Sequence, residues 1–471
     1  MGFTETVFLF AFLPLSILLY VLADKLFHND KVNNLLLVLF SIVFYYWAHK
    51  ESLFIFVVII LFTYMAGNTV NTDTVGKNKR LQFFLVIILG VLAYYKYITF
   101  IGSLLDDLTA RPIISVGELI VPIGISFTVF ESISYVIDIY RGDAQAGTLL
   151  ECFTFMSLFP KLVSGPIVLW KDFHHQLIGR RTSLEKIAYG IDRIIIGYAK
   201  KVILADSFGQ QIMLINSEIS NGGVDTPTMW IRALLYFFQL YIDFSGYSDI
   251  AIGLCNIFGF SIKENFRFPY LSKSITEFWR RWHISLGTWF REYVYIPLGG
   301  NQKGNVYIHL IIVFILTGIW HGAGWPFLLW GAAHAVLVAF ERAISDKTWY
   351  KKIPSTLKWM LTVVTIYLTW IIFMSNDIAE ARATYTGMVA MSSMPVNFTW
   401  QYYLSTRMIV FLIISVIGIG IGVDKINERL RKQVEKPVWR VIVRIALIAL
   451  FVVDIMFIVN STYSPFLYFQ F

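Results

Sequence analysis

Two histidines of this sequence lie in apolar stretches, where an ionisable side chain is costly. His283 lies within FWRRWHISLGTWFREYVYIPLGG, residues 278–300, and His321 ends an apolar run in LTGIWHGAGWPFLLWGAAH, residues 316–334. An imidazole with a pKa of about 6.5 can accept the proton of a hydroxyl group. A buried neutral histidine that hydrogen-bonds a backbone carbonyl is the alternative interpretation, and for a lone intramembrane histidine the two are evenly weighted. His334, thirteen residues beyond His321 and across a glycine- and proline-containing break, is interpreted as structural.

The segment around His283 is both basic and aromatic. As one helix it would carry an aromatic stripe made by Phe278, Trp282, Leu286, Trp289 and Tyr293. The other side would carry Arg280, His283, Gly287 and Arg291. Such a helix suits either the wall of a cavity with one polar face or a membrane surface with anionic headgroups.

A third stretch with polar residues in apolar surroundings is YIDFSGYSDIAIG, which places Asp243 and Asp249 inside an apolar run. Two acids six residues apart do not share one face of a helix. We therefore expect them to hydrogen-bond neighbouring serines, tyrosines or an arginine, as supports of the site rather than as catalysts.

The composition explains why polar residues are so informative here. Of the 471 residues, 57% are hydrophobic and only 15% are charged, whereas soluble chains carry about 25% charged residues. Apolar runs of about twenty residues recur throughout, which is the length of a membrane-crossing helix. The sequence thus predicts an all-α, polytopic integral membrane protein. The cysteines, Cys152 and Cys255, predict neither a disulfide framework nor a metal site.

About eleven transmembrane helices, with further re-entrant or interfacial helices, fit this length. The candidate spans lie near 3–23, 33–47, 52–69, 81–101, 118–139, 150–169, 186–215, 228–258, 305–323, 326–343, 357–376, 407–424 and 440–461. We expect one membrane domain over residues 1–471.

The basic residues predict orientation rather than binding to nucleic acid. The net charge is +8, but the lysines and arginines gather in short loops, including 77–80, 171–186, 347–352 and the run from Lys425 to Lys436. By the positive-inside rule these loops face the cytoplasm, which places both termini outside. The segment 261–304 then faces the cytoplasm as well.

Five stretches in order resemble the membrane-bound O-acyltransferases (MBOAT), and within them the bacterial branch of the alginate O-acetyltransferases. They are VPIGISFTVFESISYVIDIYRG, FPKLVSGPI, YIDFSGYSDIAIG, NFRFPYLSKSITEFWRRWHISLGTWFREYVYIPLGGN and TGIWHGAGWPFLLWG. They cover about residues 121–334, while the first and last hundred residues match only in hydropathy. One position departs from the branch, because Leu169 stands where an arginine is common.

This resemblance implies a reaction chamber lined by the motifs. The histidine of the tryptophan-histidine-glycine motif is catalytic in the family, which corresponds to His321 beside Trp320, and the second polar position corresponds to His283. Acetyl-CoA would be a donor substrate rather than a bound cofactor, reaching the chamber from the cytoplasm. Arg280, Arg291 and Trp282 are the candidates to bind it, since the arginine fork suits phosphate.

The acceptor would be an extracytoplasmic polysaccharide, such as an alginate-like exopolysaccharide, cellulose or peptidoglycan. A periplasmic or surface partner would relay the acetyl group, and the enzyme would lie among the lipids of the bacterial cytoplasmic (inner) membrane. Three alternatives remain: D-alanyl transfer to teichoic acid, a lipid acyltransferase, and a transporter of polysaccharide or lipid. The absence of visible related halves disfavours the transporter.

Overall fold

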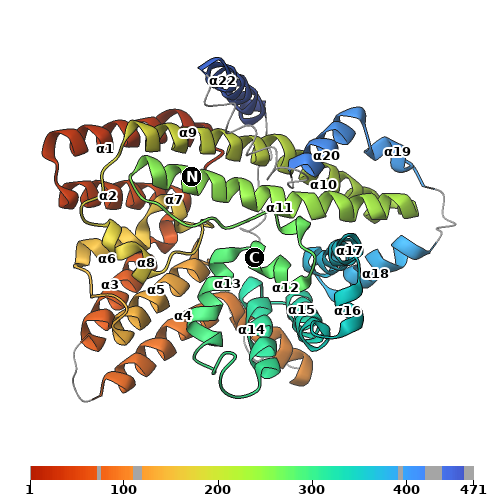
Figure 1. Ribbon diagram of the computed structural model, residues 1–471, viewed down its shortest axis with the longest axis horizontal. Coiled ribbons are helices and arrows are strands. Elements are labelled where there is room, and N and C mark those ends of the chain that lie inside the picture. The colour runs from red at the N-terminus through yellow and green to blue at the C-terminus, as the bar shows by residue number, and fades with distance from the viewer. Residues whose placement is uncertain (1, 72–75, 110–118, 391–395, 419–436, 461–471) are drawn as a thin grey trace. The chain divides into compact units, whose positions relative to one another are not determined.

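The computed structural model describes residues 2–71, 76–109, 119–390, 396–418 and 437–460, and every regular element among them is a helix (Figure 1). Six described helical segments are long and apolar enough to cross a membrane: Phe8–Phe27, Asp30–Val70, Lys77–Asp106, Trp325–Ile344, Ser355–Met374 and Val438–Asn460. Val306–His321 and Thr406–Gly418 are shorter apolar helices. The predicted all-α membrane architecture is confirmed, and the number of about eleven crossings stays a prediction. The basic run from Lys425 to Lys436 lies outside the described residues.

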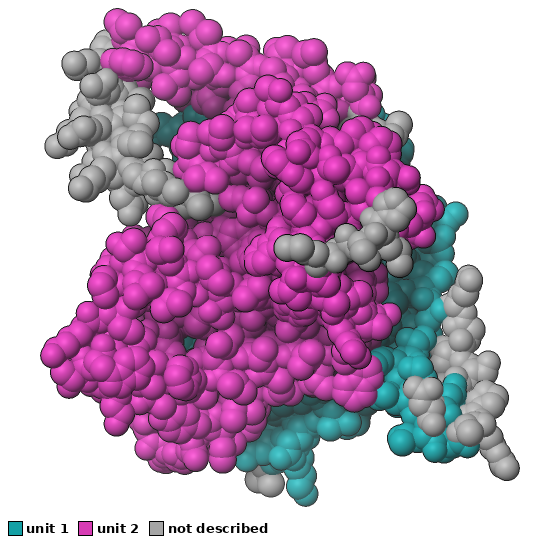
Figure 2. Space-filling view, turned by 90° about the vertical axis from the view of Figure 1, so that its right-hand side faces the viewer, with its two compact units in different colours: residues 1–194, 250–264, 288–297 teal, residues 195–249, 265–287, 298–471 magenta. Residues whose placement is uncertain are grey.

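The chain divides into two compact units, each assembled from separate stretches of sequence (Figure 2). Unit 1 comprises residues 1–194, 250–264 and 288–297, and unit 2 comprises residues 195–249, 265–287 and 298–471. The motif-dense region of 121–334 contributes to both units. A single domain over 1–471 therefore stays a prediction.

Unit 1 begins with the apolar helices of the N-terminal third. Its elements are η1 (Phe8–Phe12), α1 (Leu13–Phe27), α2 (Asp30–His49), η2 (Lys50–Ser52), α3 (Leu53–Val70), α4 (Lys77–Thr109), α5 (Ile125–Arg141), α6 (Leu149–Ser157), α7 (Phe159–Leu162), α8 (Trp170–Phe173), η3 (His174–Gln176), most of α9 (Leu184–Tyr198) and η6 (Arg291–Tyr295). Local capping sets where helices begin: Asn29 Oδ1 accepts the Lys31 N–H before α2, and Thr148 and Glu151 form a reciprocal capping box at α6.

Unit 2 contains the histidines selected from the sequence. Its elements are η4 (Ala199–Ala205), α10 (Asp206–Asn221), most of α11 (Thr226–Ile257), η5 (Pro269–Leu271), α12 (Ile275–Arg281), the start of α13 (Ile284–Phe290), α14 (Val306–His321), α15 (Trp325–Ile344), α16 (Thr348–Lys352), α17 (Ser355–Met374), α18 (Ile378–Val389), α19 (Trp400–Tyr403), α20 (Thr406–Gly418) and α22 (Pro437–Asn460). The expected long helix near 186–215 exists as the run α9–η4–α10, in which η4 is a π-helix.

Large aromatic side chains fill the core of unit 2. The indoles of Trp330 and Trp370 stack with ring centroids 5.8 Å apart, and both side chains are almost completely buried. Trp282 joins them, with its ring 5.0 Å from that of Trp370. Aromatic pairs at such distances add stability beyond their buried area. They give α12, α15 and α17 one shared, rigid contact surface.

Candidate active site

The segment that carries His283 is broken rather than continuous. α12 ends at Arg281, Trp282 takes an extended backbone conformation (φ −101°, ψ 129°), and α13 begins at Ile284. His283 itself has a φ of 45°, in the left-handed region that side chains rarely adopt. The single helix with an aromatic stripe that we predicted over 278–293 is therefore wrong. After the break, η6 continues as a π-helix, so the register of the stripe is lost a second time.

Asn265, in the loop before η5, occupies this break. Its backbone carbonyl accepts the Ile284 N–H at 2.9 Å, and its side-chain oxygen accepts the Ser285 N–H at 3.2 Å. These are the first amides of α13, which have no partner within that helix. Asn265 is completely buried, so the contacts are shielded from water. One residue from a distant loop thus sets where the second helix begins.

His283 projects into an apolar pocket of aromatic rings. Its ring centroid lies 4.7 Å from that of Phe244 on α11, 6.4 Å from Phe266 and 6.1 Å from Trp320 on α14. The side chain is 1% exposed, and burial lowers its pKa to about 3. The break lies outside the six membrane-length helices. His283 is therefore a neutral imidazole at physiological pH, and one of its ring nitrogens carries a lone pair.

His321 occupies the break between α14 and α15. It is the last residue of α14, Gly322 and Gly324 follow in extended conformations, and Pro326 lies in the first turn of α15. The ring of His321 lies 4.9 Å from Trp320, 5.3 Å from Trp330 and 5.1 Å from Phe373. The sequence prediction of a histidine at a glycine-flanked helix break is confirmed, while its catalytic role stays a prediction.

Trp320 brings the two histidines together. Its ring lies 6.1 Å from His283 and 4.9 Å from His321, and it is 4% exposed. The two candidate bases therefore contact one indole although they are 38 residues apart. Aromatic rings surround both imidazoles: Phe244 and Phe266 lie beside His283, and Trp330 and Phe373 lie beside His321.

His334 differs from the other two histidines. It is completely buried on α15, and its Nδ1 accepts a hydrogen bond from Trp279 Nε1 of α12 at 3.3 Å. Its ring contacts Trp330 at 4.9 Å. This bond joins two helices of the core, which agrees with the structural interpretation of this residue.

Glu341, on α15, is a buried polar residue that the sequence did not single out. Its carboxylate accepts the backbone N–H groups of Ile275 at 3.0 Å and Thr276 at 2.7 Å, as well as the Thr276 hydroxyl. Tyr350 donates to the same carboxylate at 3.2 Å. A carboxylate at the start of a helix accepts hydrogen bonds from the unpaired amides, and the positive end of the helix dipole stabilises its negative charge. Glu341 therefore fixes the start of α12.

The arginines of residues 261–304 differ in whether their guanidinium groups have hydrogen-bond or ion-pair partners. Arg280 is exposed and, among the described residues, has no hydrogen-bond or ion-pair partner. The same holds for the side chain of Arg267, whose backbone N–H donates to the Arg281 carbonyl at 2.9 Å. Arg281 instead pairs with Glu277 at 2.7 Å. Within residues 261–304, Arg267 and Arg280 are thus the arginines whose guanidinium groups remain available for an anion.

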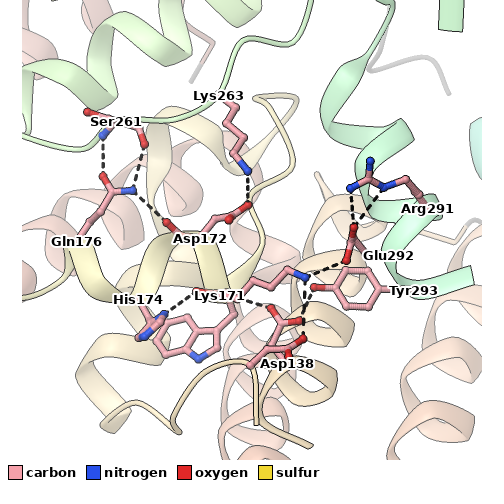
Figure 3. A network of polar contacts seen from close by, with 12 residues as sticks. Asp138, Lys171, Asp172, His174, Gln176, Ser261, Lys263, Arg291, Glu292 and Tyr293 are labelled. Atoms are coloured by element: carbon pink, nitrogen blue, oxygen red, sulfur yellow. Dashed lines mark hydrogen bonds and ion pairs between the residues drawn. The ribbon is translucent and has the colours of Figure 1, made fainter. Parts of the chain in front are cut away.

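Arg291 lies in unit 1 and is already paired. Its guanidinium contacts Glu292 at 2.8 Å, and the second Glu292 oxygen accepts from Lys171 Nζ at 2.9 Å (Figure 3). Burial alone would raise the pKa of Glu292, but the hydrogen bonds from Arg291 and Lys171 bring it below its ordinary value. Asp138 extends this network, accepting the Tyr293 hydroxyl at 2.7 Å and the Lys171 N–H at 2.9 Å. Arg291 is consequently a weaker candidate for phosphate than Arg280.

Trp282, the third candidate for donor binding, is 2% exposed. Its indole packs against Phe266 at 5.1 Å and Phe278 at 5.5 Å, in addition to Trp370. Its contacts are those of a core residue, and its role in donor binding stays a prediction.

Asp243 and Asp249 pair with two consecutive lysines of the π-helix η4. Lys201 contacts Asp243 at 2.8 Å and Asp206 at 2.7 Å, and Lys200 contacts Asp249 at 2.6 Å. We expected serine, tyrosine or arginine partners, and those hydrogen bonds stay a prediction. The lysines, 42 and 49 residues upstream of the acids they contact, were not anticipated. A π-helix widens the turn, a device common near functional sites. Both acids stabilise the packing of η4 on α11, as supports do.

Among the described residues, no cluster of histidine, cysteine, aspartate or glutamate could hold a metal ion.

Comparisons with known proteins identify the family of this chain. The profile of the membrane-bound O-acyltransferase family matches residues 15–380, so the chain belongs to this family and is an acyltransferase. A probable alginate O-acetylase AlgI of Pseudomonas putida is 37% identical over the full length of both chains. A peptidoglycan O-acetyltransferase of Helicobacter pylori is 33% identical over 83% of this chain and 80% of its own. A teichoic acid D-alanyltransferase of Streptococcus thermophilus is 30% identical over 53% of this chain and 68% of its own.

Proposed function

We propose that the protein transfers acetyl groups from acetyl-CoA to hydroxyls of an extracytoplasmic polysaccharide, in the bacterial cytoplasmic membrane. The observation that carries this proposal is the pair of buried histidines, His283 and His321, in contact with one indole. Full-length similarity to proteins named as alginate O-acetylases, and similarity over most of the chain to a peptidoglycan O-acetyltransferase, supports the reaction and the class of acceptor.

The proposed chemistry is general base catalysis by an imidazole. A histidine accepts the proton of the acceptor hydroxyl while the hydroxyl oxygen bonds to the thioester carbonyl carbon. The carbon–sulfur bond then breaks, and the coenzyme A thiolate takes the proton back from the imidazolium. The surroundings of His283 favour the neutral base before the reaction. We assign the central proton transfer to His321 and a second proton-accepting role to His283.

The donor would be held from the cytoplasmic side by the available guanidinium groups. Arg280 and Arg267 are exposed, and their backbones belong to adjacent segments, linked through the Arg267–Arg281 hydrogen bond. Arginine binds phosphate through two parallel N–H donors. We therefore propose that these two residues contact the phosphates of acetyl-CoA. A periplasmic or surface partner would carry the acetyl group onward to the polysaccharide.

Transfer of labelled acetyl groups tests this function directly. Purified protein reconstituted in lipid is given acetyl-CoA labelled in the acetyl group, with alginate, cellulose or peptidoglycan fragments as the acceptor. Label in the polysaccharide, or in a partner protein added with it, supports the proposal. Transfer only from a D-alanyl carrier-protein thioester would make teichoic acid D-alanylation the function. Movement of polysaccharide or lipid without covalent labelling would make the protein a transporter.

A further inference from the structure

We propose that Asn265 is a positioning residue that holds His283 in one tautomer, with the proton on Nδ1, so that Nε2 is the atom that accepts the proton of a substrate. This inference rests on the proposed transferase function for its catalytic meaning. The tautomer itself follows from hydrogen bonds within unit 2.

The orientation of the Asn265 amide is set by a backbone donor. The Ser285 N–H can only donate, and it lies 3.2 Å from the Asn265 side-chain atom assigned as Oδ1. That atom must therefore be the oxygen, since the amide nitrogen offers only donors in this direction. The other side-chain atom, Nδ2, lies 3.2 Å from Ser248 Oγ, which can accept from it. Both ends of the amide agree with this assignment.

The same oxygen determines where the proton of His283 lies. Nδ1 of His283 is 3.1 Å from Asn265 Oδ1. An amide oxygen only accepts, so a hydrogen bond between these atoms requires a proton on Nδ1. In a neutral imidazole this leaves Nε2 with the lone pair, as a proton acceptor.

A second contact points to the same tautomer. Ser285 Oγ lies 2.8 Å from Asn265 Oδ1 and 3.4 Å from His283 Nδ1. The hydroxyl proton is directed to the amide oxygen, which cannot donate in return. Toward Nδ1 the hydroxyl therefore offers only its lone pair, and Nδ1 must again carry the proton. Two acceptors thus share the Nδ1–H.

The described contacts of the ring are with uncharged side chains. They are Phe244 on α11, Phe266 and Asn265 in the loop, Ser285 on α13 and Trp320 on α14. The acids of α11, Asp243 and Asp249, are ion-paired with Lys201 and Lys200. The imidazole of His321 packs against the same Trp320 indole. Burial is the cause of the low pKa of His283.

The tautomer can be measured without any activity. Protein labelled with ¹⁵N-histidine is examined by solid-state NMR in lipid bilayers at neutral pH, and the His283 signals are assigned by difference from His283→Gln. A protonated Nδ1 and an unprotonated Nε2 are expected. A proton on Nε2 would overturn the proposal whatever reaction the protein performs.

Asn265→Asp provides a second test through the pH profile. The carboxylate keeps the acceptor but adds a negative charge that stabilises the imidazolium, so the pKa of His283 rises. A base must be neutral, so the pH at which kcat/KM for acetyl transfer falls to half should move up by about one to three units. Ser285→Ala, which keeps the backbone N–H and adds no charge, is the control and should leave the profile in place.

The two tests fail in distinguishable ways. A lower turnover of Asn265→Asp with an unchanged pH profile would make Asn265 a merely structural residue and would refute the proposal. Absence of acetyl transfer by the wild-type protein would refute the proposed function, while the NMR measurement would still decide the tautomer. If Asn265→Asp fails to fold, the wild-type NMR spectrum decides alone.

Discussion

The carboxylate of Glu341, near the end of α15, accepts the backbone N–H of Thr276, at the start of α12, at 2.7 Å. The same two helices meet again where Trp279 donates to His334. α12 is thereby held at its first turn and along its side, which fixes the direction in which it leads to Arg280 and His283.

Replacing Glu341 with alanine should destabilise the protein. Hydrogen bonds to a charged group contribute about 1.5–3 kcal/mol, and the amides of Ile275 and Thr276 would lose their partner. We expect a lower melting temperature in detergent for Glu341→Ala and a smaller loss for Glu341→Gln, which keeps one acceptor. Asp346→Ala is the control, because the Asp346 side chain is 95% exposed in its pair with Lys351 and such pairs contribute little. Equal melting temperatures for all three variants would contradict this role of Glu341.

His321 should be the residue that the reaction cannot lose. Removal of a general base costs about 10²–10⁴ in rate, so His321→Ala should abolish acetyl transfer and His283→Ala should reduce it strongly. His334→Ala, which breaks the bond to Trp279, should mainly lower stability and yield. The measurement is turnover per monodisperse purified protein. Retention of more than a tenth of wild-type turnover by His321→Ala would make His321 a core histidine.

Arg280 and Arg291 should differ in their effect on the donor. A lost charge-assisted contact to phosphate corresponds to about tenfold or more in affinity, so Arg280→Ala should raise the KM for acetyl-CoA by about that factor. Arg291→Ala should raise it less, because Glu292 already neutralises that guanidinium. Initial rates against acetyl-CoA concentration check both. An unchanged KM in Arg280→Ala would favour a role of this segment at lipid headgroups.

The ion pair of Lys171 and Glu292 should stabilise unit 1 within a defined pH window. The pKa of Glu292 is lowered, so its contribution is present above its unfolded pKa of about 4.3 and is lost as the pH falls through the folded value. Burial alone would lower the pKa of Lys171, but Glu292 raises it, so its contribution is lost only as the pH rises above about 10.4. The difference in melting temperature between wild type and Glu292→Gln should be full at pH 7 and shrink below about pH 4. A difference that stays constant from pH 7 to pH 3 would contradict it.

The segment 261–304 should face the cytoplasm. Lys303 is exposed in the loop before α14, and the native cysteines, Cys152 and Cys255, are both buried. Lys303→Cys should therefore resist membrane-impermeant thiol reagents in intact cells and react after permeabilisation. Rapid labelling of intact cells would reverse the orientation and the side from which the donor enters.

The break at His321 could be predicted from the sequence, and the break at His283 could not. Gly322, Gly324 and Pro326 are local signals that end one helix and begin another. No glycine or proline adjoins His283, and the residues around it continue a helical pattern of aromatic side chains. The break is instead stabilised by Asn265, eighteen residues upstream, which supplies the partners for the first amides of α13. Local periodicity contains no information about such a tertiary partner.

The partners of the buried acids were hidden for a related reason. Asp243 and Asp249 are ion-paired with Lys201 and Lys200, but these lysines lie in a run that has the pattern of an amphipathic helix. The two lysines lie in the π-helix η4, and no residue type in the sequence predicts a π-helix there. Glu341 likewise resembles an ordinary charged residue at the end of a membrane helix until α12 is placed beside it.

The contact between α14 and α15 has a mechanical consequence. A Cβ added at Gly331 would lie 2.6 Å from the Phe314 carbonyl oxygen, and one added at Gly318 would collide with the Phe327 carbonyl oxygen. The two backbones therefore touch without intervening side chains and leave no space in which to slide or bend independently. His321, at the end of α14, and Glu341, on α15, therefore lie on one rigid helical hairpin. Any opening that admits a bulky substrate must swing this helical hairpin as a whole or take place in other helices.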